Sequence, residues 1–240
     1  MIDLHCHLLP DIDDGAQTET ESIDLLQQAI ADGITHMVLT PHVKPGRYNN
    51  TLNNLQVPFQ RLQQVITEQQ LIIKLSLGGE VRLCDEILDL FAKDNLPFIG
   101  TYDNQKVMLL ELPHNGIPAS SDKLIDWFME RDIIPMIAHP ERNKAIISDI
   151  NKAAPFIMRG CLFQLTAMSV TGDFGDKAYG VAHQFLEQGL ATVIASDAHN
   201  SKRRPAILSK AFNHVAEKYS KALAKELLID TPKCIIASRL

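Results

Sequence analysis

The N-terminal stretch MIDLHCHLLPDIDDGA, residues 1–16, contains the pattern that decides the fold. Its apolar run Ile2–His5 predicts a short β-strand, and a loop with three aspartates follows the strand. Residues two apart on a strand point in the same direction, so His5 and His7 can bind one ion while Cys6 points elsewhere. The stretch therefore predicts a strand whose carboxyl end delivers metal ligands to a site.

The same unit, a strand followed by a helix, recurs along the rest of the chain. Short apolar runs predict strands at Ile2–His5, Ile34–Thr40, Ile72–Leu77, Val107–Leu112, Ile133–Ala138, Leu162–Leu165 and Thr192–Ala195. Amphipathic stretches predict helices at Thr20–Ala31, Leu52–Thr67, Asp85–Ala92, Ser120–Arg131, Asp176–Gln188 and Arg204–Tyr219. The segment Asp149–Met158 fits either a helix or a loop. This alternation predicts an α/β fold built around a parallel sheet.

Length and composition are those of a globular protein. The chain has 240 residues, of which 45% are hydrophobic and 22% are charged, so it can close one large core. α/β barrels of about 200–250 residues commonly form one domain. No linker, low-complexity segment or internal repeat interrupts the chain, and we expect residues 1–240 to form a single domain. The polar stretch Lys44–Asn54 predicts a loop that covers a site.

Charge and targeting features argue against several classes of partner. The net charge of −6 and the scattered basic residues argue against nucleic-acid binding and against a polybasic membrane patch. No run approaches the ~18 apolar residues needed to cross a bilayer, and no basic segment typical of a signal peptide opens the chain. The cysteines are widely spaced, which predicts reduced thiols. We therefore expect a cytoplasmic protein, and no feature of the sequence indicates its oligomeric state.

Histidines and carboxylates follow six of the predicted strands. They are His5 and His7, His42 in TPH, Glu80 in GGE, Glu111 in LLEL, His139 in AHPER, and Asp197 and His199 in SDAH. In a βα barrel the carboxyl ends of the strands meet on one face, where active sites lie. A single residue of this kind is weak evidence, but ligand types at six strand ends indicate a metal site. A calcium loop at Asp11–Gly15 is disfavoured, because its glycine comes one position early and no glutamate closes the loop.

The ligand types restrict the choice of metal. Imidazole and carboxylate ligands without thiolates suit manganese, iron or zinc. About nine ligands are too many for one ion, so we expect two to three divalent ions, with manganese as the first choice. Of the other histidines, His36, His183 and His214 are expected to be structural, whereas His114 lies three residues after Glu111 and can reach the rim of the site.

Together these motifs resemble those of the polymerase and histidinol phosphatase (PHP) superfamily. Within it, the stretches HCHLLPDIDDGA, GRYNN, GGEVRL and SDAHN resemble the bacterial tyrosine phosphatases of capsule and exopolysaccharide operons. The resemblance spans Met1 to about Tyr219 and implies a distorted (β/α)7 TIM-like barrel of the PHP type with a trinuclear metal site. The metal ligands that it implies are His5, His7, Asp14, His42, Glu80, Glu111, His139, Asp197 and His199.

The resemblance also implies a substrate and the residues that bind it. The substrate would be phosphotyrosine on an autophosphorylating bacterial tyrosine kinase that controls polymer length. Arg142 in HPER and Arg204 in RRP match positions expected to bind the phosphate oxygens in catalysis, although Arg204 is otherwise explained as a surface charge. Arg47 and Tyr48 either contact a peptide or phenol ring or fill an exposed loop. The chain departs from many relatives at Val43, where they carry a second histidine.

Three functions fit this ligand set. The loop motifs favour a protein-tyrosine phosphatase over a phosphatase of a small metabolite such as histidinol phosphate, and the complete ligand set argues against a metal-binding barrel without catalysis. A cysteine phosphatase is excluded because no Cys-x5-Arg motif is present, and G-x-S-x-G and P-loop motifs are also missing. An amidohydrolase would want a bridging lysine where this chain offers Glu80 and Glu111. If phosphate is cleaved, metal ions must do it.

Overall fold

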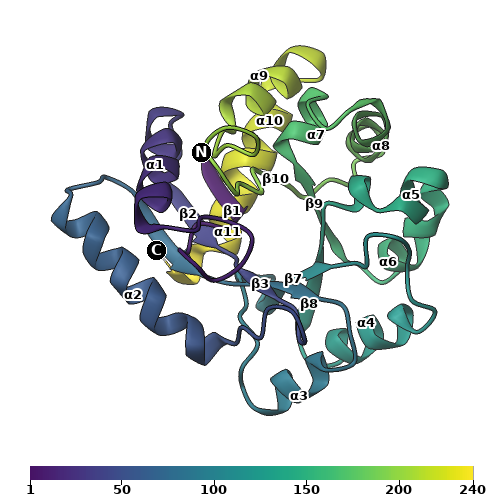
Figure 1. Ribbon diagram of the computed structural model, residues 1–240. Helices are drawn as coiled ribbons and strands as arrows, with labels where there is room; N and C mark the ends of the chain where they lie inside the picture. The colour runs from purple at the N-terminus through teal and green to yellow at the C-terminus, as the bar shows by residue number, and fades with distance from the viewer. Residues whose placement is uncertain (240) are drawn as a thin grey trace.

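Strands occupy the centre of the molecule and helices surround them (Figure 1), as seen in a computed structural model that describes residues 1–239. The strands are β1 (Ile2–Cys6), β2 (His36–Leu39), β3 (His42–Val43), β4 (Lys74–Leu77), β5 (Glu80–Arg82), β6 (Gly100–Tyr102), β7 (Gln105–Glu111), β8 (Ile133–Ala138), β9 (Leu162–Thr166) and β10 (Val193–Ala195). All seven predicted strands are present within a few residues of their predicted bounds, whereas β3, β5 and β6 were not predicted.

The surrounding helices differ in length. They are α1 (Glu19–Ala31), α2 (Leu52–Glu68), α3 (Ile87–Ala92), α4 (Ser121–Met129), α5 (Lys144–Ser148), α6 (Ala154–Met158), α7 (Ala167–Thr171), α8 (Asp176–Glu187), α9 (Ser209–Lys218), α10 (Lys221–Lys225) and α11 (Thr231–Ile235). Short 3-10 turns are η1 (Pro140–Arg142), η2 (Ile150–Ala153) and η4 (Ala237–Arg239), and η3 (Glu226–Asp230) is a π-helical turn. Among residues 1–239, no helix is long and apolar enough to cross a membrane.

The strands form two sheets in which nearly all neighbours are parallel. One sheet has the order β1-β2-β4, and the other has the order β10-β9-β8-β7-β5-β3, with β6 antiparallel to β7. The predicted α/β fold with parallel sheets is therefore confirmed. The predicted distorted (β/α)7 TIM-like barrel is not confirmed, because the sheet is not closed: β1 and β10 are joined only by an isolated bridge between Cys6 and Ala198 and by a few backbone hydrogen bonds.

Two interruptions in the chain explain why the sheets separate. Thr40 and Pro41 lie between β2 and β3, and Pro41 has no N–H group to donate to a neighbouring strand. Gly78 and Gly79 lie between β4 and β5. A Cβ atom at Gly79 would lie 2.4 Å from Cγ of Pro97, so only glycine allows this close approach. The ladder that begins with β2 and β4 therefore stops and starts again as β3 and β5.

Two hydrophobic cores lie on opposite faces of the sheets. Along β7, Val107 and Leu109 belong to an inner core, whereas Met108 and Leu110 belong to the outer core beneath the helices. This alternation follows from the period of two along a strand. The inner core also contains Ile235 at the end of α11, which lies behind the strands in Figure 1. The strands thus curve around a packed interior, and the outer core joins them to the helices.

Helix starts are set by capping groups, some of which lie far away in the sequence. Thr51 and Asn54 form a capping box at the start of α2, close to the predicted bound. By contrast α9 begins at Ser209, five residues after the predicted start at Arg204. The Asp32 carboxylate accepts the N–H groups of Leu208 and Ser209 at 2.7 and 2.9 Å and so fixes this start.

Candidate metal centre

The carboxyl ends of the strands surround a polar pocket of about 240 Å³. It is lined by Asp14, His42, Lys44, Arg47, Tyr48, Glu80, Arg82, Glu111, His114, His139, Arg142, Asp197, His199 and Arg204. His5 and His7 are fully buried and contact Glu80 and Asp197. Every residue predicted for the site therefore lies in this pocket or against it. None of the four cysteines in the described chain lines the pocket.

Backbone geometry aims the strand ends at this pocket. The N–H groups of His7 and Asp197 donate to the carbonyl oxygens of Ala198 and His5, both at 2.8 Å, and align the end of β1 with the turn after β10. His139 and Asp197 adopt the left-handed backbone region, with φ angles of 34° and 53°. This region is unfavourable for residues other than glycine, and such strain concentrates at functional sites.

Glycine is also required where the loop after β1 returns to the site. A Cβ atom at Gly15 would lie 2.0 Å from the carbonyl oxygen of His7, a distance that no side chain tolerates. The neighbouring N–H of Ala16 donates to this same oxygen at 3.1 Å. The loop therefore folds directly onto His7 and brings Asp13 and Asp14 beside the histidines.

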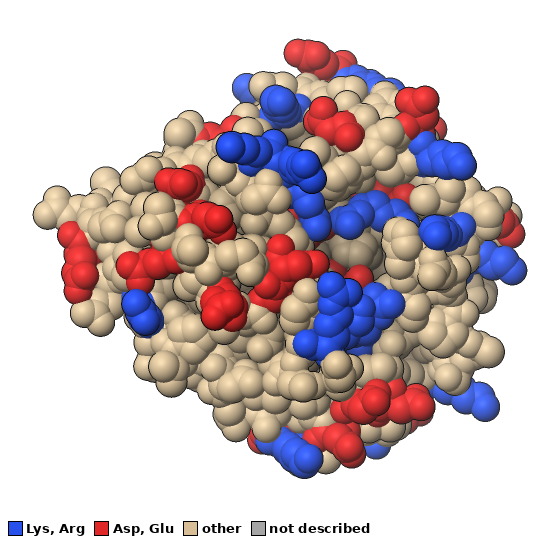
Figure 2. Space-filling model, viewed as in Figure 1, with Lys and Arg blue, Asp and Glu red and all other residues tan. Residues whose placement is uncertain are grey.

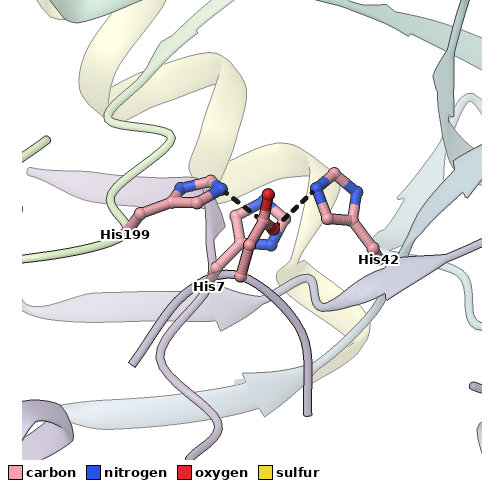
Figure 3. A group of neighbouring side chains, drawn as sticks. His7, His42 and His199 are labelled. Carbon is pink, nitrogen blue, oxygen red and sulfur yellow. Dashed lines mark ion pairs between the residues drawn. The ribbon is translucent and has the colours of Figure 1, made fainter. Parts of the chain in front are cut away.

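Four groups of side chains bring their ligand atoms within 4.8 Å of one another. They are His7, Asp14, His42 and His199; His5, His7 and Glu80; His5, His139 and Asp197; and His42, Glu80 and Glu111. Figure 3 shows part of the first group, in which His42 and His199 point to a shared carboxylate, the Asp14 side chain, at 3.2 and 3.6 Å. Together the four groups contain all nine predicted ligands, and several residues belong to two groups.

The two histidines of β1 and its end are held in defined orientations by partners outside the predicted ligand set. Nδ1 of His5 lies 2.8 Å from Oε1 of Gln164, and Nδ1 of His7 lies 2.7 Å from Oδ2 of Asp13. Because both partner oxygens accept hydrogen bonds, both Nδ1 atoms donate, and the Nε2 atoms face each other at 3.1 Å. Two imidazole nitrogens arranged in this way favour a shared cation.

Gln164 and the separate role of Asp13 were not predicted from the sequence. Gln164 is the one polar residue in the buried strand run LFQL, which is the signal that could have identified it. Asp13 belongs to the three aspartates that follow β1, and only the structure shows that it contacts His7 while Asp14 contacts His42 and His199. Lys44 and Arg82, which line the pocket, were also not predicted.

Glu80 lies at the centre of the cluster and is almost fully buried. Its Oε1 accepts a hydrogen bond from Nε2 of His139 at 2.7 Å. Its Oε2 lies 2.8 Å from Nδ1 of His42 and 3.5 Å from Nε2 of both His5 and His7, yet neither Oε2 nor Nδ1 of His42 has a hydrogen-bond partner among the described residues. Ligand atoms that surround one metal ion lie close together in this way without bonding to each other. The nitrogen and oxygen donors around Glu80 therefore fit divalent cations.

The carboxylates strongly perturb the protonation of the histidines. Burial lowers the pKa of His7, but the charge of Asp13 and hydrogen bonds to Asp13 and Asp197 together raise this pKa to about 9. Burial also lowers the pKa of His42, yet Glu80 and Asp14 raise it to about 11. In turn, hydrogen bonds from His199 and His42 hold the pKa of Asp14 well below its usual range. The side chains alone thus hold protons on His7 and His42 at neutral pH.

Metal binding is therefore expected to release protons and to strengthen as the pH rises. A ligating imidazole nitrogen must be deprotonated, and pKa values of about 9 for His7 and 11 for His42 mean that both carry an extra proton at pH 7.5. Between pH 6.5 and 9 we expect the apparent affinity for manganese to rise about tenfold per pH unit for each proton displaced. Calorimetry in buffers of different ionisation enthalpy measures this release. An affinity independent of pH would contradict the assignment.

Two arginines meet at one carboxylate. Arg142 and Arg204 both form ion pairs with Oδ2 of Asp197, which is almost fully buried. Burial raises the pKa of Asp197, but His5 and the two arginines outweigh burial and hold this pKa well below its usual range. The guanidinium of Arg142 also lies over the ring of Phe174, with 5.1 Å between its carbon and the ring centre. Both predicted phosphate-binding arginines are therefore in the pocket, and each retains access to solvent.

The loop after β3 forms another wall of the pocket. The ring of Tyr48 stacks on that of His42, with centroids 5.5 Å apart and planes inclined by 7°. The guanidinium of Arg47 lies over the ring of Tyr48, with 5.0 Å between its carbon and the ring centre. The predicted loop over Lys44–Asn54 thus covers one side of the site, although its last residues, from Leu52 onward, belong to α2.

The remaining histidines separate into one at the pocket and others outside it. His114 lines the pocket, as its position after Glu111 suggested. His36 donates to or accepts from Oγ of Ser76 at 2.8 Å, away from the pocket. His183 contacts the hydroxyl of Tyr219 at 2.6 Å and the carbonyl of Val170 at 3.1 Å. The structural roles predicted for His36 and His183 agree with these contacts.

Substitutions should separate the ligands from these structural histidines. His42→Ala and His139→Ala are expected to reduce bound metal by at least one ion per chain and to abolish phosphatase turnover, because each removes a donor next to Glu80. His183→Ala is the matched control and should retain metal and activity. Metal content by mass spectrometry and turnover would be measured on the same preparations. Loss of metal from His183→Ala with retention by His42→Ala would reverse the assignment.

Comparison with known proteins places these features in a family. Residues 1–237 match the family described as capsular polysaccharide synthesis, CpsB/CapC. The chain is 35% identical to CapC of Staphylococcus aureus over 213 aligned residues. The aligned region covers 89% of this chain and 82% of CapC. It is 31% identical to the tyrosine-protein phosphatase YwqE of Bacillus subtilis over 204 aligned residues. This aligned region covers 85% of this chain and 79% of YwqE.

A solved structure supports the same relationship. It was reported among the crystal structures of YwqE from Bacillus subtilis and CpsB from Streptococcus pneumoniae, described as metal-dependent tyrosine phosphatases. The two structures superpose with a TM-score of 0.86 and 29% sequence identity, over 93% of this chain and 90% of that chain. Both the sequence and the arrangement of its strands and helices therefore agree with one assignment: the chain belongs to the CpsB/CapC family of capsular polysaccharide synthesis proteins.

Proposed function

We propose that the protein is a metal-dependent protein-tyrosine phosphatase that hydrolyses phosphotyrosine on a bacterial tyrosine kinase regulating capsular or exopolysaccharide synthesis. The observation that carries this proposal is the convergence of nine nitrogen and oxygen donors on one pocket that also contains Arg142 and Arg204. Family membership and the similarity to YwqE and CpsB support the substrate class. The pocket contains no cysteine within the described chain, which fits hydrolysis without a thiol nucleophile.

The nine clustered residues would hold two to three divalent ions, with manganese as the first choice and iron or zinc as alternatives. Bound ions would supply Lewis acidity that activates water, and positive charge that allows a phosphate to approach four carboxylates. Gln164 and Asp13 orient His5 and His7 so that their Nε2 atoms point into the cluster. The fixed orientation lowers the entropic cost of binding.

The other pocket residues fit the substrate. Arg142 and Arg204 present guanidinium groups beside Asp197, where they can bind phosphate oxygens as well as the carboxylate. Tyr48, stacked on His42 and contacted by the Arg47 guanidinium over its ring, forms one wall of the pocket, and the phenol ring of phosphotyrosine can pack beside this wall. The leaving phenolate has an ordinary pKa of about 10, so the reaction needs only modest help from an acid.

We also propose a distorted (β/α)7 TIM-like barrel, of the PHP type, for residues 1–240. Two features support it. The N–H groups of Gly78 and Glu80 donate to the carbonyl oxygens of Leu39 and Pro41, at 2.8 and 3.1 Å, across one break between the sheets, and hydrogen bonds link the end of β1 to the turn after β10. An inner core that includes Ile2 and Ile236 supports a single domain. The unpaired state of the four cysteines fits the reducing cytoplasm, where a kinase substrate would be met.

Turnover of three substrates tests the proposal. A phosphotyrosine peptide, the matched phosphoserine peptide and histidinol phosphate would be compared by kcat/KM in the presence of manganese. We expect the phosphotyrosine peptide to be hydrolysed at least tenfold more efficiently than either alternative. A preference for histidinol phosphate would instead identify a metabolite phosphatase. Failure to hydrolyse any of the three with metal bound would identify a metal-binding barrel without this activity.

A further inference from the structure

A second hollow, here called the side pocket, adjoins the catalytic pocket along the turn that follows β10. It has a volume of about 170 Å³ and lies between this turn, α7 and the first residues of α9. Lys202, Arg203 and Lys210 line it. The next residue in the turn, Arg204, lines the catalytic pocket, so one short piece of chain forms a wall of both.

The side pocket has a net positive charge in a chain whose net charge is −6. Its three cations are exposed, and they form no ion pair with any residue in the described part of the chain. One carboxylate, that of Asp173, also lines the side pocket and accepts a hydrogen bond from the hydroxyl of Thr171 at 2.7 Å. Figure 2 shows lysine and arginine side chains gathered on both sides of a central hollow.

The turn that carries these cations is held by several hydrogen bonds. Oδ1 of Asn200 accepts the N–H of Arg203 at 2.7 Å and that of Lys202 at 3.3 Å. The N–H groups of His199 and Asn200 both donate to the carbonyl oxygen of Arg204, at 2.9 and 3.1 Å. The positions of Lys202 and Arg203 relative to the catalytic pocket are therefore set by the same turn that positions Arg204.

We infer that the side pocket binds an acidic side chain of the phosphopeptide substrate, two to three residues away from the phosphotyrosine. This inference rests on the proposed function. Arg203 and Arg204 are consecutive residues that line one pocket each, and their Cα atoms are about 3.8 Å apart. An extended peptide advances about 3.3 Å per residue, so a side chain a few residues from the phosphotyrosine can reach the cations of the side pocket. Unpaired cations beside a phosphate site select a substrate that carries additional negative charge.

The lining of the side pocket favours glutamate over a second phosphotyrosine. Its volume of about 170 Å³ suits a carboxylate side chain rather than a phosphorylated ring. Met168 and Ile207 supply apolar surface for the methylene groups of glutamate, while Lys202 and Arg203 reach its carboxylate. The side pocket thus determines which phosphotyrosine is hydrolysed, and the catalytic pocket performs the hydrolysis.

Matched peptides and paired charge reversals test the inference. One phosphotyrosine peptide carries glutamate two and three residues from the phosphotyrosine on both sides, the second carries glutamine there, and a small aryl phosphate serves as the third substrate. The unchanged protein would be compared with a double variant that combines Lys202→Glu and Arg203→Glu. The control double variant combines Lys93→Glu with Lys221→Glu, because both lysines are exposed and line neither pocket.

At low ionic strength the unchanged protein and the control should hydrolyse the glutamate peptide about tenfold more efficiently than the glutamine peptide. The Lys202→Glu, Arg203→Glu variant should lose this ratio while its kcat for the aryl phosphate stays within twofold. High salt should reduce the ratio in the unchanged protein, because it screens exposed charges.

Three outcomes would overturn the inference: a ratio near one in the unchanged protein, an unaltered ratio in the Lys202→Glu, Arg203→Glu variant, or an equal loss in the control variant. The failure of the proposed function is distinguishable from these, because no phosphotyrosine substrate would then be hydrolysed by any of the proteins.

Discussion

Exhaustive chelation is expected to abolish hydrolysis of a phosphotyrosine peptide, with activity falling at least a hundredfold, and added manganese is expected to restore it. The physical reason is the loss of the ions that activate water. The carboxylates of Asp14, Glu80, Glu111 and Asp197 are among the donors that would hold these ions. Without divalent cations no Lewis acid activates water, and no thiol of the described chain lines the pocket to attack in its place.

The measurement combines turnover with metal content on the same samples. Circular dichroism of the chelated protein shows whether it is still folded, so that loss of activity is not confused with unfolding. Alkylation of the thiols is the control, and it should leave most of the activity because Cys6 and Cys161 are buried and no cysteine lines the pocket. Full activity in protein shown to contain no metal would exclude the proposed mechanism.

Arg142→Ala is expected to lower kcat by about 10²–10³ while leaving metal content unchanged. A phosphoryl group in transfer spreads negative charge over three oxygens, and removing one preorganised donor from such a site typically costs this factor. Metal should be retained because Asp197, which loses one ion pair, keeps the other with Arg204. Arg142→Lys should restore only part of kcat, since an ammonium group cannot form the paired hydrogen bonds of a guanidinium.

Arg204→Ala is expected to behave similarly, because its turn is held by the hydrogen bonds of Asn200 and His199. The control is Arg131→Ala, an exposed arginine that lies over Trp127 with its guanidinium carbon 3.9 Å from the ring centre. The kcat, the KM and the bound metal would be measured for each variant. Near-native kcat/KM in both Arg142→Ala and Arg204→Ala would show that the phosphate-binding groups lie in another part of the pocket.

The positions of the strands and the identity of the clustered residues could be predicted from the sequence, because both depend on local patterns. Apolar runs indicate strands, and polar residues at their carboxyl ends must meet if the strands are parallel. The orientation of the imidazoles could not be predicted in this way. His5 depends on Gln164, which is 159 residues away in the sequence, and such a partner is defined only when β1 and β9 pack together.

The same limit applies to the sheets and to α9. Pro41 is visible in the motif TPH, but its effect on closure depends on which strands lie beside it. The start of α9 depends on Asp32 at the end of α1, which no local pattern around Ser209 reveals. The side pocket combines α7 with the turn after β10, so its basic residues appear unrelated in the sequence. Non-local partners therefore account for what the sequence did not predict.

The left-handed backbone at His139 and Asp197 has a consequence for protein engineering. A residue other than glycine in this conformation costs roughly 1 kcal/mol or more, so glycine at either position would relieve backbone strain. It would also delete a member of the cluster and remove a partner of Glu80 or of the two arginines. Removing one partner of a buried ion pair costs about 3–5 kcal/mol, which exceeds the strain that glycine would relieve at Asp197. Backbone strain at this position is therefore not a target for raising the melting temperature, because the side chain that causes the strain also holds the two arginines in place.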